Sequence, residues 1–252
     1  MNPTTTTTAP LAGALADIWV YLAATPLLGL TLTLLVYHGA FLFYQRCSFN
    51  PLANPVAVAV AVLAALLWAT GTPYATYFEG AQFVHFLLGP ATVALSVPLF
   101  EQLARLRQLW LPMLGALVVG TLAATVTAVG VGWALGASRA TLASLAPKSV
   151  TSPVAMGISE KIGGLPSLTA VLVVGTGVTG AVCARFLFDA LRIRDPIVRG
   201  FALGNAAHGI GTARAFQVSE EMGAFAGLAM GLTALFSAVV LPLLAGLLLR
   251  WV

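Results

Sequence analysis

The chain has 252 residues, of which 59% are hydrophobic and 8% charged, whereas about a quarter of the residues in a soluble domain carry a charge. This composition excludes a soluble globular protein, and the net charge of +4 reflects arginines near helix ends and not a nucleic-acid surface. Several charge-free runs approach or exceed the roughly 20 residues that a membrane-crossing helix needs. We therefore expect an all-α polytopic membrane protein, because a β-barrel would alternate over short strands.

The predicted elements begin after a short tail. Residues 1–10, MNPTTTTTAP, have neither a positively charged region nor a small-residue cleavage site, which favours a disordered tail over a secretory signal. Residues 11–23 fit a short interfacial helix, and residues 11–252 are expected to form a single transmembrane domain. Seven membrane spans are predicted, at about residues 25–45, 51–71, 82–102, 111–136, 166–188, 198–217 and 222–249.

An eighth segment, residues 141–164, is long enough to cross a membrane but contains two prolines, two lysines and a glutamate. With Arg46 and residues 101–108 in the cytoplasm, the loop after Gly136 lies outside. The arginine-rich loop at residues 192–199 then lies in the cytoplasm only if residues 141–164 dip into the membrane and return to the same side. The positive-inside rule favours a cytoplasmic position for this loop and therefore favours the returning course. We expect a re-entrant or broken helix that is buried in protein or lines a wet cavity.

A weak internal repeat accompanies this pattern. FLLGPA (residues 86–91) matches FALGNA (residues 201–206) at four of six positions with an offset of 115, and Pro51 and Pro166 share that offset. The predicted repeats are about residues 25–136 and 139–252. Because the matching spans run in opposite directions in this topology, we expect the inverted repeat of many secondary transporters.

One predicted span, LGNAAHGIGTARAFQ at residues 203–217, is unusually rich in glycine and polar residues. Each glycine costs about 1 kcal/mol relative to alanine in an exposed helix interior. The glycines are either packing points between helices or the cause of a break in this one. The polar side chains favour a break, because such groups at membrane depth usually face the interior of a bundle or a water-filled pathway.

A broken helix suits an anion, because its free N–H groups and its partial positive charge can hold a carboxylate. PKSVTSPVA (residues 147–155) offers the same device, and GPAT (residues 89–92) is the more apolar counterpart of GNAAH. Two breaks that face each other near the middle of the membrane would enclose a small anion. The predicted substrate-binding residues are Lys148, Ser149, Thr151, Ser152, Pro153, Asn205, His208, Gly209, Gly211, Thr212, Pro90 and Thr92.

Two of these residues have alternative interpretations. Lys148 is either a point charge for the anion or a side chain that extends to the membrane interface. His208 is the predicted proton-coupling residue, because imidazole titrates near physiological pH; the alternative is a structural histidine that donates to a backbone carbonyl. The chain lacks HExxH, GxSxG and phosphate-loop motifs, so we expect no enzyme, no cofactor and no metal site. GTGVTG (residues 175–180) is interpreted as a helix-packing face.

Two long motifs carry a family resemblance: PKSVTSPVAMGISEKIGGLPSLTAV and RDPIVRGFALGNAAHGIGTARAFQ, with LLGPATVALSVPLF upstream and GAFAGLAMGLTALFSAVVLPLL downstream. From about residue 25 onward the chain resembles the LrgB/CidB family. That family includes bacterial proteins described as antiholin-like or holin-like and the LrgB-like half of plastid glycolate/glycerate translocators. The resemblance implies a multi-pass protein of a bacterial inner membrane, with its site at residues 147–155 and 204–213.

Two functions remain open at this point. The first is secondary transport of small monocarboxylates of the glycolate, lactate, pyruvate or glycerate class, coupled to protons. The alternative is an antiholin-like or holin-like regulator of murein hydrolase export and cell lysis. The resemblance also implies either a separate small LrgA-like membrane partner or self-sufficiency, and by analogy with transporters we expect a homodimer or a higher homo-oligomer.

Overall fold

The computed structural model describes residues 26–84, 90, 93 and 96–248. These residues form helices without any β-strand, which confirms the all-α class for the described part of the chain. Contacts divide the chain into two units, residues 1–92 and 93–252, which are considered separately. The predicted tail, the interfacial helix, the motif at residues 86–91 apart from Pro90, and part of the span at residues 82–102 lie outside the described residues.

In the first unit, one long helix packs against two shorter ones. It approaches α4 closely at Gly29, where a Cβ atom would lie 2.6 Å from the carbonyl oxygen of Tyr77. The hydroxyl groups of Thr33 and Tyr77 are 2.7 Å apart. The elements are α2 (Pro26–Arg46), a 3-10 turn (Pro51–Ala53), α3 (Pro55–Thr70) and α4 (Tyr74–Ala81).

The span predicted at residues 51–71 is shorter than expected. Asn54 accepts hydrogen bonds from the backbone nitrogens of Val56 and Ala57 and so fixes the start of α3. The resulting 16 residues reach about 24 Å, less than the ~30 Å hydrocarbon core. Four helices in the described part of the chain are long and apolar enough to cross a membrane: Leu27–Arg46, Leu103–Ala134, Pro166–Ala190 and Glu220–Ala245.

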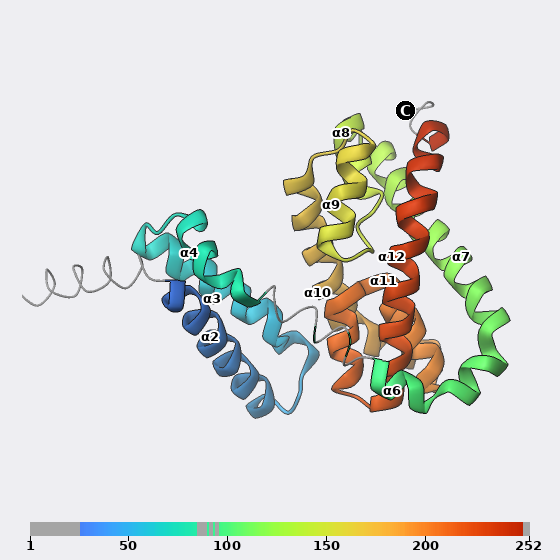
Figure 1. Cartoon of the computed structure of the whole chain (residues 1–252), viewed down its shortest axis with the longest axis horizontal. Coiled ribbons are helices and arrows are strands. Elements are labelled where there is room, and N and C mark those ends of the chain that lie inside the picture. Colours follow the sequence, from blue (N-terminus) through green and yellow to red (C-terminus); the bar gives the residue numbers. More distant parts are fainter. Residues whose placement is uncertain (1–25, 85–89, 91–92, 94–95, 249–252) are drawn as a thin grey trace, which may run out of the picture. The chain divides into compact units, whose positions relative to one another are not determined.

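The described part of the second unit combines three long helices with two helical hairpins, and Figure 1 shows these helices. The long helices are α7, α10 and α12, and the hairpins are formed by α8 with α9 and by α11 alone. The elements are α6 (Ser96–Glu101), α7 (Leu103–Ala134), α8 (Arg139–Leu145), α9 (Ser152–Lys161), α10 (Pro166–Ala190), α11 (Pro196–Phe216) and α12 (Glu220–Leu248).

The first hairpin occupies the predicted re-entrant segment. Its helices have seven and ten residues, too few for either to cross the hydrocarbon. The chain then returns to α8, because the backbone nitrogen of Leu165 donates to Ser144 Oγ at 2.8 Å. Thr169 Oγ1 of α10 donates to Ser159 Oγ of α9 at 2.7 Å, and both residues are fully buried. The segment thus turns back on itself, as its charge pattern predicts.

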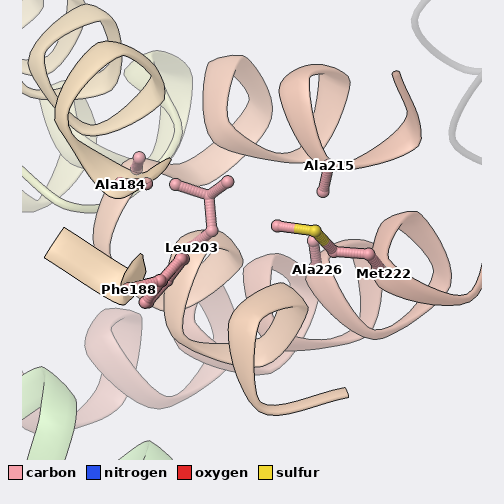
Figure 2. Close-up of a cluster of buried hydrophobic side chains, with 7 residues drawn as sticks. Ala184, Phe188, Leu203, Ala215, Met222 and Ala226 are labelled. Atoms are coloured by element: carbon pink, nitrogen blue, oxygen red, sulfur yellow. The ribbon is translucent and has the colours of Figure 1, made fainter. Parts of the chain in front are cut away.

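The second hairpin is α11, in which the predicted break is present. Ala207 (φ −125°, ψ 16°) and His208 (φ 41°, ψ −135°) leave helical geometry. Leu203 and Ala215, on opposite sides of the break, belong to one buried cluster, although a straight helix would separate these positions by about 18 Å. Figure 2 shows both residues in this cluster beside Met222 of α12.

The folded-back course of α11 corrects one prediction. We call residues 196–206 the first leg of α11 and residues 209–216 its second leg. The first leg lies on α12, since a Cβ atom on Gly200 would collide with the Met222 backbone. The last residue of the second leg, Phe216, contacts Gly223 of α12. Both ends of α11 therefore lie at one end of the unit. The segment at residues 198–217 is not a membrane span but a second hairpin, because the reversal at His208 sends the chain back.

The inverted repeat also needs correction for its last pair of elements. The offset of 115 pairs α7 with α12, and these helices run in the same direction: Met113 packs with Phe225 and Val129 with Ala245. The expected inversion depended on counting residues 198–217 as a crossing. The two long helices that each follow a hairpin, α10 and α12, run in opposite directions, because Val173 packs with Ala234 and Phe188 with Met222.

Candidate functional site

The ends of the two hairpins meet on α7. We call residues 146–151 the first tip and residues 205–209 the second tip. Thr125 Oγ1 donates to the carbonyl oxygen of Ala146 at 3.3 Å, and Thr121 Oγ1 donates to Asn205 Oδ1 at 3.2 Å. Positions four residues apart are neighbours on a helix face, so the two threonines place the tips side by side along α7.

Both tips also contact one residue of α10. Val150 of the first tip and Ala155 pack against Val173, and the Val173 carbonyl oxygen lies 3.0 Å from His208 Nε2 of the second tip. Because a carbonyl oxygen only accepts, Nε2 carries the hydrogen and Nδ1 is left for another partner.

His208 occupies an unusual backbone conformation in a space made for its ring. A φ of 41° with a ψ of −135° is rare for any residue except glycine, and such a conformation costs about 1–3 kcal/mol. The side chain is only 4% exposed. Its ring lies against Gly177 of α10, where a Cβ atom would come within 2.7 Å of Cε1. The predicted helix-packing face thus makes room for the histidine.

The other polar groups of the second tip have partners inside the protein. Asn205 accepts from Thr121 and donates to the Ala116 carbonyl at 3.4 Å, and Thr212 Oγ1 donates to the His208 carbonyl at 2.9 Å. Asn205 also lines a cavity of about 380 Å³ between α7 and α11 whose other lining residues are apolar. These contacts support a positioning role for Asn205 in addition to its predicted ligand role.

The first tip presents charge, hydroxyl groups and a helix end. Lys148 is half-buried and its Nζ donates to the buried Ser149 Oγ at 3.5 Å. Thr151 precedes α9 without capping it through its side chain, and Ser152 is the first residue of that helix. Two helices therefore begin at the tips, α9 and the second leg of α11. Helix starts carry unpaired N–H groups and about half a positive charge.

The sequence prediction missed two hydroxyl groups of α12. Thr233 and Ser237 are 1% and 0% exposed, and their oxygens have no hydrogen-bond partner among the described residues. They share a helix face with Met230, whose sulfur lies 3.8 Å from Thr212 Oγ1. Buried hydroxyl groups without partners are costly, so we add these two groups to the candidate ligand-binding residues. Their spacing within an apolar helix was the available signal.

The structure brings most of the predicted residues together, with exceptions. Lys148, Ser149 and Thr151 belong to the first tip, Asn205, His208 and Gly209 to the second, and Gly211 and Thr212 to the helix that starts there. Pro153 is exposed on α9. Pro90 lies in the other unit, and Thr92 is outside the described residues.

Comparison with known proteins identifies the relatives of this chain. The model of the LrgB-like family matches residues 33–247. An uncharacterized protein, YwbG of Bacillus subtilis (strain 168), is 36% identical over 86% of this chain and 96% of its own length. The antiholin-like protein LrgB of Bacillus mycoides (strain KBAB4) is 30% identical over 87% of this chain and 95% of its own. No solved structure matches the chain. The protein is a multi-pass membrane protein that belongs to the LrgB-like family.

Proposed function

We propose that this protein is a secondary transporter of small monocarboxylates of the glycolate, lactate, pyruvate or glycerate class. The observation that carries the proposal is the meeting of two oppositely directed hairpin tips on Thr121, Thr125 and Val173. Irregular backbone at membrane depth is tolerated where it is buried in protein or lines a cavity. In transporters such breaks form the substrate site near the middle of the membrane.

The chemistry of the tips favours an anion. Helix starts at Ser152 and Gly209 offer N–H groups, Lys148 offers a charge, and Thr233 and Ser237 offer hydroxyl groups. The buried polar side chains of the described residues include no carboxylate, so nothing acidic among them repels a bound anion. A 2-hydroxy or 2-oxo acid would place its carboxylate at the helix starts and its second oxygen at the hydroxyl groups.

His208 couples this binding to a proton. Its Nε2 is held by the Val173 carbonyl, so Nδ1 is the atom that gains or loses the proton. A protonated ring carries a second positive charge beside Lys148, and a bound carboxylate offsets that repulsion. Substrate and proton would then enter and leave together.

The arginines at one end of the second unit determine the membrane orientation that we propose. Arg105 at the start of α7 forms an ion pair with Glu221 at the start of α12. The loop before α11 adds Arg192 and Arg194 at the same end, and the first turn of α11 adds Arg199. The positive-inside rule places this end in the cytoplasm of a bacterial inner membrane. The proposal also includes a homodimer or a higher homo-oligomer, either self-sufficient or with a separate small LrgA-like membrane partner.

Uptake of labelled glycolate or pyruvate into proteoliposomes tests transport. We expect saturable uptake that increases with an inward proton gradient, loss of this uptake in His208→Ala and Ser152→Ala, and normal uptake in Gly175→Ala, whose Cβ meets no atom within 4 Å. Absence of substrate-dependent flux in both directions, from a correctly folded wild-type protein, would refute the proposal.

An antiholin-like role is the second candidate function. The observation that favours it is the name carried by relatives at 30% identity, antiholin-like protein LrgB, and that name supports regulation of lysis better than it supports transport. Release of a large encapsulated dye from vesicles that contain the purified protein would favour a pore-forming role. Retention of the dye during carboxylate flux would favour transport.

A further inference from the structure

A second pocket lies at the arginine-rich end of the second unit, away from the hairpin tips. It has a volume of about 360 Å³ and is formed by α10, both legs of α11 and the start of α12. Its floor is apolar and includes Phe188, Leu203 and Met222 of the buried cluster shown in Figure 2. Volumes of this size accommodate a small ligand or the head group of a larger one.

The charged groups of this pocket are unbalanced. Three arginines line it, Arg185 from α10, Arg199 from the first leg of α11 and Arg214 from the second leg, against one acidic residue, Asp189. Among the neighbouring carboxylates, Asp195 caps α11, Glu221 pairs with Arg105, and Glu220 is exposed and does not line the pocket. Arg214 also donates to Gln217 Oε1, and the described lining carries three cationic side chains and one carboxylate.

Arg199 is fixed in position. Its Nη2 donates to Asp189 Oδ1 at 2.6 Å, its Nε donates to the Ile193 carbonyl at 2.6 Å, and its guanidinium group lies 5.5 Å from the centre of the Phe188 ring. Arg185 is held loosely, at 3.9 Å from Asp189, and its side chain is 61% exposed. A planar guanidinium group that is not fully engaged is well suited to bind phosphate.

The mouth of the pocket is apolar as well as cationic. Val218, which lines the pocket, is exposed, and so are Phe186 and Leu187 beside Arg185. Arg185 lies five residues before the end of α10, about 7.5 Å inside the span. At this depth exposed apolar groups meet acyl chains while arginine side chains reach the head groups.

We propose that this pocket binds the phosphodiester head group of an anionic phospholipid from the cytoplasmic leaflet. Basic pockets between membrane helices on that side bind such head groups. Because its arginines come from α10 and from both legs of α11, the lipid joins the hairpin to α10 and stabilises the closed hairpin. The site is independent of whether the protein transports carboxylates or regulates lysis.

Lipid binding to the purified full-length chain tests the proposal. Native mass spectrometry and thermal unfolding in a neutral detergent would follow titrations with dioleoyl phosphatidylglycerol, dioleoyl phosphatidylcholine and glycerol phosphate. We expect tight binding and a raised melting temperature with phosphatidylglycerol alone. Arg185→Gln and Arg214→Gln should each weaken binding about fivefold. The exposed Arg194, which does not line the pocket, supplies the control Arg194→Gln.

Four results would overturn the proposal. Equal binding of phosphatidylcholine, or unchanged binding by the Arg185→Gln and Arg214→Gln double variant, would remove the arginines from recognition. An equal loss in Arg194→Gln would indicate general charge attraction. Glycerol phosphate that binds as tightly as the lipid would identify a free anion as the ligand. The single variant Arg185→Gln guards against misfolding, because its side chain is largely exposed.

Discussion

His208 is the residue at which backbone, packing and chemistry coincide. The reversal of α11 gives it a positive φ, the Val173 carbonyl fixes its ring, and Gly177 provides the space. Strained residues persist where the surrounding structure holds them, and they cluster at functional sites. The polar neighbours and nearby glycines of this histidine made it a candidate site residue. The sequence left two interpretations open, a proton-coupling residue and a structural histidine that donates to a backbone carbonyl. The structure contains the contact with a carbonyl, that of Val173.

Replacing His208 with glycine and with alanine separates backbone strain from side-chain function. Both variants lose the bond to Val173, but glycine accepts a positive φ without strain, so His208→Gly should be about 1 kcal/mol more stable than His208→Ala. Both should lack uptake if the ring couples the proton. Thermal unfolding in detergent and proteoliposome uptake measure the two effects. A more stable alanine variant would contradict the strained backbone.

Gly177 and Gly175 form a matched pair for testing the space around the ring. A Cβ at position 177 would lie 2.9 Å from His208 Nε2, whereas a Cβ at position 175 meets nothing within 4 Å. Gly177→Ala should therefore lose about 1–3 kcal/mol of stability and displace the ring. Gly175→Ala should resemble the wild-type protein in unfolding and uptake. Equal behaviour of the two variants would show that α10 does not confine His208.

At the scale of elements, the hairpins depend on small residues and local capping. Asp195 caps the first leg of α11, and Gly204 allows that leg to lie directly on the α12 backbone at Ala226. The first hairpin is closed by Ser144, Ser159 and Thr169 instead. Backbone contact made through glycine is typical of membrane helices, which lack a hydrophobic driving force between them.

Gly204 and Gly231 provide a test of the second hairpin. A Cβ at position 204 would overlap the Ala226 backbone, whereas a Cβ at position 231 meets nothing within 4 Å. We expect Gly204→Ala to separate the hairpin from α12 and to accelerate amide hydrogen exchange across residues 196–216. Gly231→Ala should leave that exchange unchanged. Protection that stays equal in both variants would argue against this packing.

At the scale of the whole molecule, the direction of the chain follows from which segments cross. Charge alone identified residues 141–164 as returning, because the alternative places an arginine-rich loop outside. The same reasoning did not detect the return of α11: Arg199 and Arg214 were assigned to opposite ends of a span, yet they line one pocket. That difference reverses the expected direction of α12.

Accessibility of introduced cysteines tests this topology. In a background with Cys47 and Cys183 replaced by serine, we introduce Arg194→Cys, Gln217→Cys and Lys161→Cys one at a time. A membrane-impermeant maleimide should reach residues 194 and 217 from the same side, because α11 returns, and residue 161 from the other side. Labelling of residue 217 from the side of residue 161 would restore α11 as a crossing helix.

Sequence by itself determined the membrane setting, the helical class, the returning course of residues 141–164 and the two polar breaks. Each follows from local properties: hydrophobic length, positive charge, and glycine or proline within an apolar run. Tertiary structure alone decided that α11 reverses and that both tips meet on Thr121, Thr125 and Val173. It also decided that Thr233 and Ser237 are buried without a hydrogen-bond partner within the described part of the chain. The reason is physical, since a glycine-rich break permits both a kink and a reversal, and only packing against α10 and α12 selects between them.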